Sequence, residues 1–230
     1  MPGSYPLTAR ALDGAGNQAE ASITISVSAF RIEIISPANG ATINKSKTIV
    51  YGKIHEQTGE TGVVVNGVLA EVQGSDFAAI IPLQLGQNIL TAIATTVDGL
   101  QVQTSVTINT ASQQEMIRLT VYPNGSVLKP PANTLHVTFE AEAHLPNPVA
   151  SYSWDFNGDG TSEITGANLK VVAHYQYPGL YFPRVTVTDT QGNAYTETTI
   201  VNIFSLDEID TLLRSKWERM KGALLSGNIE

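Results

Sequence analysis

The residues with the clearest capacity for chemistry lie in the stretch 153–163, which reads SWDFNGDGTSE. Its acidic and amide side chains fall at positions 1, 3, 5 and 9 of a calcium loop of the D-x-[DN]-x-[DN]-G type, and Gly160 takes the glycine position 6. Oxygen ligands on alternate residues of a tight loop suit a hard cation. We expect the chain to require no cofactor, and in one interpretation this stretch predicts a Ca²⁺ site. Its candidate ligands are Asp155, Asn157, Asp159 and Glu163.

The same stretch has a second interpretation, as the end of a core strand followed by a tight turn. Position 12 of a calcium loop is a bidentate Glu, and here it is Gly166. The side chain of Asp155 can instead accept hydrogen bonds from backbone N–H groups of the turn. The residues alone leave both interpretations open.

Two tyrosines are candidates for ligand binding. Tyr152 and Tyr177 are predicted to form an exposed aromatic patch that contacts a sugar or a protein. An aromatic ring offers a flat apolar face together with a polar hydroxyl group, which suits either ligand.

Catalysis is not expected. The chain has no cysteine, its four histidines show no metal-ligand spacing, and no Gly-x-Ser-x-Gly motif occurs. Asp155 and Asp159 share one short turn, so they cannot flank a substrate as a glycosidase pair does. We therefore predict that the protein is not an enzyme.

Charge and hydropathy exclude further classes. The net charge is -8 and the 13 Lys and Arg residues are scattered, so no nucleic-acid partner is expected. No apolar run reaches the roughly 18 residues of a membrane-spanning helix, so we expect no membrane insertion. The residues after Met1 do not read as a secretion signal, and we expect the signal of an exported parent protein to lie outside this sequence.

The composition predicts an all-β protein, because Thr, Val, Ile, Gly, Asn and Ser are abundant and only 15% of residues are charged. Residues 5–27 read as a hairpin around the turn at 13–17. The hairpin recurs 83 residues later, where Thr91-Ala-Ile-Ala and Ser105-Val-Thr-Ile repeat Thr8-Ala-Arg-Ala and Ser22-Ile-Thr-Ile. Residues 1–28 are thus predicted to be the terminal hairpin of a truncated Ig-like module. It would pair with a neighbouring edge or swap into a second chain, giving a possible strand-swapped homodimer through residues 5–27.

The segment 29–112 is predicted to be one β-sandwich. Asn66-Gly67 between two β-rich runs indicates a type I′ hairpin. Together with Ser36-Pro-Ala-Asn-Gly40 and the Gly86-Gln-Asn88 turn, it resembles the bacterial Ig-like and glucodextranase B-like modules over residues about 30–110. The resemblance implies a non-catalytic Ig-like sandwich.

The segment 113–204 is predicted to be a second sandwich. Ser-Trp154-Asp-Phe-x-Gly-Asp-Gly, Tyr175-x-x-Pro-Gly-x-Tyr and Val185-Thr-Val-x-Asp resemble a PKD (polycystic kidney disease) domain over residues about 115–204. The resemblance implies that Trp154 lies in the core between the sheets. Asn157 lengthens the family's acidic turn, and Pro183 predicts an edge or bulged strand at that point.

Residues 205–230 change to helical periodicity. Ser205 and Glu208 form a capping box, and Gly227 can end the helix. The apolar stripe consists of Leu206, Ile209, Leu213, Trp217, Met220 and Leu224. The helix either lies on the sandwich or, as we expect from so broad a stripe, begins a further domain or contacts a partner.

Taken together, the sequence predicts tandem Ig-like β-sandwiches with a C-terminal amphipathic helix. The expected function is that of a non-catalytic extracellular or cell-surface module array of a larger bacterial protein. It would act as a spacer and adhesion region that contacts protein or polysaccharide. The alternatives are a carbohydrate-binding accessory region of a polysaccharide-degrading enzyme and a calcium-rigidified adhesin segment.

Overall fold

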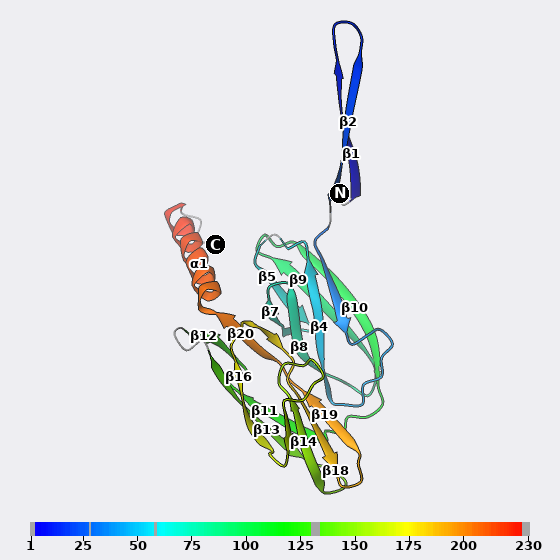
Figure 1. Cartoon of the computed structure of the whole chain (residues 1–230), viewed down its shortest axis with the longest axis vertical. Coiled ribbons are helices and arrows are strands. Elements are labelled where there is room, and N and C mark those ends of the chain that lie inside the picture. The colour runs from blue at the N-terminus through cyan, green and yellow to red at the C-terminus, as the bar shows by residue number, and fades with distance from the viewer. Residues whose placement is uncertain (1–2, 28, 58, 130–133, 227–230) are drawn as a thin grey trace.

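The computed structural model describes residues 3–27, 29–57, 59–129 and 134–226. Within these ranges the chain forms strands in several sheets, antiparallel except for the parallel pair of β12 and β20, and one C-terminal helix (Figure 1). This confirms the predicted all-β fold with a terminal helix. A hairpin, two sandwiches and the helix follow one another along the sequence.

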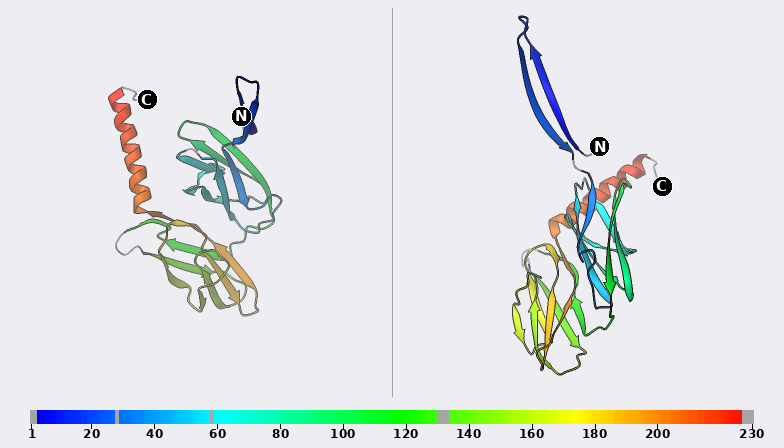
Figure 2. Two further views of the ribbon diagram at one scale, coloured as in Figure 1. Left: turned by 45° about the horizontal axis from the view of Figure 1, so that its top comes forward. Right: turned by 90° about the vertical axis from the view of Figure 1, so that its right-hand side faces the viewer.

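The hairpin at the start stands apart from the rest of the molecule (Figures 1 and 2). Strands β1 (Gly3–Leu12) and β2 (Gln18–Val27) form a sheet of two strands. The turn between them is held by Asp13, which accepts hydrogen bonds from the backbone N–H groups of Ala15 and Asn17 at 2.9 and 2.8 Å. Every described side chain of the hairpin is exposed. The hairpin therefore folds by local pairing, without a core of its own.

The first sandwich consists of two four-stranded sheets, ordered β3-β4-β8-β7 and β10-β9-β5-β6. Its strands are β3 (Arg31–Ser36), β4 (Lys47–His55), β5 (Thr61–Val65), β6 (Val68–Leu69), β7 (Glu71–Gln73), β8 (Asp76–Pro82), β9 (Gly86–Thr96) and β10 (Gln101–Thr110). Alternate residues of both sheets point inward, and Phe77, Leu90 and Ile108 are among the buried ones. The predicted Asn66-Gly67 hairpin is confirmed, since both residues have the positive φ that a type I′ turn requires.

The second sandwich has three sheets, ordered β11-β13-β16, β12-β20-β17 and β15-β14-β18-β19. Its strands are β11 (Ile117–Tyr122), β12 (Gly125–Leu128), β13 (Leu135–Ala143), β14 (Val149–Asp155), β15 (Ile164–Gly166), β16 (Lys170–Tyr175), β17 (Gly179–Tyr181), β18 (Arg184–Asp189), β19 (Ala194–Thr198) and β20 (Val201–Ser205). Trp154 is 1% exposed in the core, and its indole N–H donates to the carbonyl of Asn168 at 3.0 Å. The predicted core position of Trp154 is confirmed.

The expectation for Pro183 is wrong. It lies between β17 and β18, which belong to different sheets, and β18 begins one residue later as an inner strand between β14 and β19. The chain changes sheet at this proline, so its missing N–H is not needed by either sheet. Its carbonyl accepts a hydrogen bond from the N–H of Thr199 at 3.0 Å.

Helix α1 (Leu206–Ser226) begins at the predicted capping box. The N–H of Ser205 donates to Glu208 at 2.9 Å, the N–H of Glu208 donates to the Ser205 hydroxyl at 3.0 Å, and the first of these bonds lowers the pKa of Glu208. None of its described residues is buried, so the helix does not lie with its apolar stripe on the sandwich. The predicted end at Gly227 is outside the described residues. In the described part of the chain, no helix has the length and apolar character needed to cross a membrane.

Candidate functional site: the boundary between the two sandwiches

The acidic turn that follows β14 is held by its own side chains. Asp155 is 3% exposed, and its two carboxylate oxygens accept from the backbone N–H groups of Gly158 at 2.7 Å and Gly160 at 2.9 Å. The Asn157 side chain accepts from the N–H of Asp159 at 2.8 Å and donates to its carboxylate at 3.0 Å. The turn is thus closed by hydrogen bonds between side chains and backbone.

Two carboxylates complete the turn. Asp159 accepts from the N–H of Thr161 at 2.7 Å, and this bond lowers the pKa of Asp159. Glu163 accepts from the N–H of Phe156 at 2.8 Å. Over the described ranges, no three His, Cys, Asp or Glu residues are grouped as metal ligands. The geometry matches the interpretation as a structural turn, and calcium ligation by these residues stays a prediction.

The structure does not bring the two candidate tyrosines together at the surface. Tyr152 is 8% exposed and belongs to the core of the second sandwich. It lies two residues before Trp154 on β14, so both side chains point to the inner side of the strand. Tyr177 is 73% exposed. The expected exposed pair is therefore wrong for Tyr152, while ligand contact by Tyr177 stays a prediction.

The acidic turn also supports a contact between the two sandwiches. A Cβ atom at Gly158 would lie 2.8 Å from the carbonyl oxygen of Phe182, so the backbone of the turn packs closely against that residue. The ring of Phe182 meets the ring of Tyr51, on β4 of the first sandwich, edge to face at 5.1 Å between centroids. Such aromatic pairs contribute about 0.5–1.5 kcal/mol beyond the area they bury. The turn thus positions an aromatic contact across the boundary.

These residues line a cleft of about 720 Å³ between the sandwiches. Tyr51 and Phe182 provide apolar surface, and Thr48 and Thr198 provide hydroxyl groups. Arg184 is exposed along the cleft. Rings, hydroxyl groups and a guanidinium group together suit a polar ligand with an apolar face.

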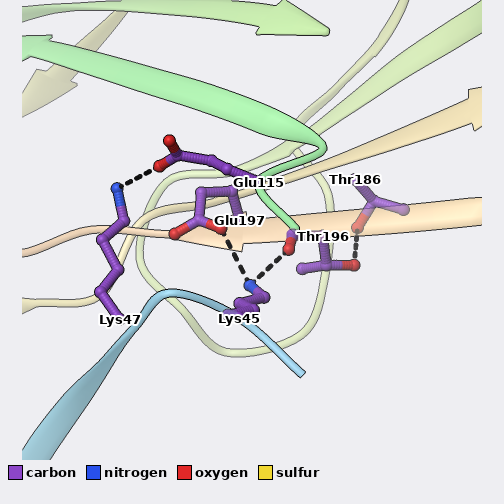
Figure 3. Close-up of polar contacts among 6 residues, drawn as sticks. All are labelled: Lys45, Lys47, Glu115, Thr186, Thr196 and Glu197. Atoms are coloured by element: carbon purple, nitrogen blue, oxygen red, sulfur yellow. Dashed lines mark hydrogen bonds and ion pairs between the residues drawn. The ribbon is translucent and has the colours of Figure 1, made fainter. Parts of the chain in front are cut away.

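Lys45, Lys47 and Glu197 also line the cleft, and Figure 3 shows the polar contacts that they make. The amine of Lys45 donates to the Thr196 carbonyl at 2.6 Å and pairs with the Glu197 carboxylate at 3.0 Å. The Glu197 side chain is only 9% exposed, so Lys45 is the cation that compensates a buried charge. Lys47 pairs with Glu115 at 3.1 Å, and the Glu115 side chain is 45% exposed, so this carboxylate is not buried as that of Glu197 is.

Further polar contacts lie along the boundary toward the helix. Asn202 of β20 is 1% exposed and donates to Glu71 of β7 at 3.0 Å. Lys216 of α1 pairs with Glu60 of the first sandwich at 2.6 Å. The bond from Asn202 to Glu71 adds to the aromatic pair and the lysine pairs between the two sandwiches, and the Lys216 pair joins the helix to the first sandwich.

The sequence did not reveal this boundary. One signal was present at Glu197, which occupies an inward position in β19, two residues after Tyr195. An acidic residue at a position that alternation assigns to the core requires a buried partner. The identity of that partner, Lys45 in the other sandwich, depends on tertiary structure that periodicity does not carry.

Comparisons with known proteins agree with this architecture. The family model described as PKD domain matches residues 128–203, so this segment is a PKD domain, as the resemblance implied. No curated protein matches the sequence.

Solved structures resemble the chain weakly. The fibronectin(III)-like modules of Clostridium thermocellum CbhA are 12% identical, with 76% of this chain and 94% of that chain covered and a TM-score of 0.30. The tandem Ig repeats of Dlar are 14% identical, with 77% and 98% covered and a TM-score of 0.32. The mixed-linkage glucan protein SGBP-B of Bacteroides ovatus, solved with a heptasaccharide, is 14% identical, with 89% and 53% covered and a TM-score of 0.24.

Proposed function

We propose that this chain is a non-catalytic segment of an extracellular or cell-surface bacterial protein. An Ig-like sandwich, residues 29–112, and a PKD sandwich, residues 113–204, are held in one orientation and act as a spacer. The pair presents its surfaces to protein or polysaccharide. The observation that carries this proposal is the shared boundary, where aromatic packing and an ion pair with a buried carboxylate join two separate cores.

A fixed boundary suits a spacer because it keeps the two sandwiches at a constant distance and angle. Two sandwiches connected only by a flexible linker would reorient freely, whereas contacts between them restrict the angle. In their described parts, the segments at the two ends present exposed apolar side chains, among them Leu7 and Ile23 of the hairpin and Leu213 and Trp217 of the helix. In the proposal they connect the pair to further structure.

Small-angle X-ray scattering on the complete chain tests the spacer function. Scattering from a fixed pair fits a single arrangement, and the fit does not improve when the angle between the sandwiches is allowed to vary. A profile that requires an ensemble of angles contradicts the proposal.

The cleft favours a second candidate function, carbohydrate binding as an accessory region. Its volume of about 720 Å³ and its lining of two rings, hydroxyl groups and Arg184 match the chemistry of a sugar site. Pull-down on a panel of insoluble polysaccharides tests it. Binding that is lost in Arg184→Ala and kept in Arg118→Ala, an exposed arginine on β11, supports this function. The absence of binding to every polysaccharide argues against it.

A further inference from the structure

The hairpin of β1 and β2 has one polar and one apolar face. On the polar face the hydroxyl groups of Thr8 and Ser22 are 2.8 Å apart, and Arg10 pairs with Glu20 at 3.4 Å. The apolar face carries the alternate residues of both strands, which are Tyr5, Leu7, Ala9, Ala11, Ala19, Ala21, Ile23 and Ile25. Each of them is exposed. The hairpin thus has the pattern of a sandwich sheet without the facing sheet.

The hairpin matches β9 and β10 of the first sandwich pair by pair. With an offset of 83 residues, all ten pairs from Gly3↔Val27 to Leu12↔Gln18 coincide with the ten pairs from Gly86↔Thr110 to Thr95↔Gln101. The hydrogen bond between Thr8 and Ser22 recurs as that between Thr91 and Ser105, at the same 2.8 Å. Both strands and their register are therefore those of the last hairpin of an Ig-like sandwich.

The turn of the hairpin is held by the same hydrogen bonds as the turn between β18 and β19 of the PKD sandwich. Asp13 accepts from Asn17 through both its backbone N–H and its side-chain amide, and Asp189 accepts from Asn193 in the same two ways. Ala9 and Ala11 then correspond to Val185 and Val187, both of which are fully buried. Hairpins of this form have their apolar face covered in each sandwich.

The first sandwich shows what covers that face. Leu7 and Ile25 are 52% and 42% exposed, whereas their equivalents Leu90 and Ile108 are 0% and 1% exposed. The cover consists of β5, which pairs with the outer edge of β9, and of the facing sheet β3-β4-β8-β7. In the described residues of the hairpin, the edge of β1 equivalent to that pairing has no strand beside it.

Exchange of hairpins with a second copy of this chain does not provide such a cover. The described strands β3 to β8 are already covered by β9 and β10. If the hairpin of one copy replaced β9 and β10 in another, an equal apolar face would be uncovered, and no apolar area would be gained.

We propose that the apolar face of the hairpin is the closing face of a further Ig-like sandwich, whose other six strands resemble β3 to β8 and precede the hairpin in the same polypeptide. In the first sandwich those strands precede β9 and connect to it through residues 83–85. The same order ahead of Gly3 places a strand equivalent to β5 beside β1 and an apolar sheet over Ala9 and Ala11.

An extended chain tests this proposal. Residues 29–85 are repeated immediately ahead of Gly3, so that they precede β1 as they precede β9. Amide hydrogen exchange is then measured for β1 and β2 in the chain as it stands and in the extended chain. We expect exchange in β1 to slow by about 100-fold or more, because the strand becomes the inner strand of a sandwich.

Matched substitutions separate the two faces. Ala11→Asp on the apolar face removes the gained protection in the extended chain, whereas Thr8→Asp on the polar face keeps it. A second extended chain, with Arg10→Ile and Ala19→Val, gives the hairpin the residues that β9 and β10 carry at these positions. The proposal is overturned if the native hairpin stays unprotected in the extended chain, whether or not this second chain becomes protected.

Discussion

The rings of Tyr51 and Phe182 meet edge to face across the boundary between the two sandwiches, with their centroids 5.1 Å apart. Tyr51 lies on a strand of the Ig-like sandwich, and Phe182 lies where the PKD chain changes from one sheet to another. The backbone of Phe182 is supported from behind by the acidic turn at Gly158. One aromatic pair therefore connects the acidic turn, the change of sheet and the neighbouring module.

Removal of this pair should loosen the boundary. Phe182→Ala is expected to lower the free energy of unfolding by at least about 1 kcal/mol, because the aromatic contact and its buried area are lost. Denaturant unfolding measures the change. The control is Tyr177→Ala, which removes a ring that is 73% exposed, and should have little effect. Equal effects of the two substitutions would contradict a specific role for Phe182.

The buried carboxylate of Glu197 gives a second prediction. Lys45→Ala leaves this charge without its cation and should destabilise the protein by about 1–3 kcal/mol. The nearby pair of Lys47 and Glu115 is more exposed, so Lys47→Ala should cost only about 0–1 kcal/mol. The double variant Lys45→Ala with Glu197→Gln should recover part of the loss. The account fails here if both lysine variants have the same stability.

Two glycines of the acidic turn give a matched comparison. Gly158 and Gly160 have φ of 79° and 93°, so alanine is strained at either position. Only at Gly158 would the new methyl group also meet the backbone of Phe182. Gly158→Ala should therefore be less stable than Gly160→Ala by about 1–3 kcal/mol, as is typical of overpacking. Thermal unfolding of the two variants tests the difference, and equal melting temperatures would show that the turn does not press on the boundary.

Asp189 predicts an acid-sensitive step. Hydrogen bonds from the side chains of Asn193 and Asn147 lower the pKa of Asp189 from the ordinary 3.8 to about 2. Because the pKa of Asp189 is lower in the folded state, its ionised carboxylate stabilises the fold at any pH above its unfolded pKa. This stabilisation is lost as the pH falls through the folded pKa. Between about pH 4 and pH 2 the stability of the wild type should fall more steeply than that of Asp189→Asn. Parallel curves would contradict this. The control is Asp13→Asn, at the equivalent position of the hairpin turn, which should leave the stability of the two sandwiches unchanged.

The acidic turn gives a prediction about calcium. Because its oxygens already accept backbone and side-chain hydrogen bonds, Asp155→Ala should destabilise the protein by about 1–3 kcal/mol in calcium and in EDTA alike. Asp159→Ala, at an exposed position, should cost less. A melting temperature that rises with calcium, and no longer does so in Asp159→Ala, would instead establish the calcium site.

Much of the fold could be predicted from the sequence because its signals are local. Asn66-Gly67 specifies a turn through its own φ angles, and Ser205 and Glu208 cap a helix within one turn. The core position of Trp154 follows from the resemblance of its motif to a PKD domain. The ambiguity at Asp155 could not be resolved in this way, because a calcium loop and a self-bonded turn use the same residue types. The predicted exposure of Tyr152 is wrong because Tyr152 lies two residues from Trp154 on β14, and both side chains point into the core.

The boundary was beyond sequence reasoning for a different reason. Lys45 and Glu197 are separated by 152 residues and lie in different modules, so no periodic pattern relates them. Phe182 follows a short strand and precedes a proline, and a pattern of that kind does not indicate which neighbour the ring will meet. Contacts between modules depend on where turns from two separately folded units come together.

Residual dipolar couplings of the backbone amides test the fixed boundary most directly. The couplings are collected for both sandwiches in the wild type and in Phe182→Ala, and an alignment tensor is fitted to each sandwich separately. The account predicts that the two tensors of the wild type agree in magnitude and orientation, and that they diverge in Phe182→Ala. Two different tensors in the wild type would show that the sandwiches move independently and would contradict the central claim.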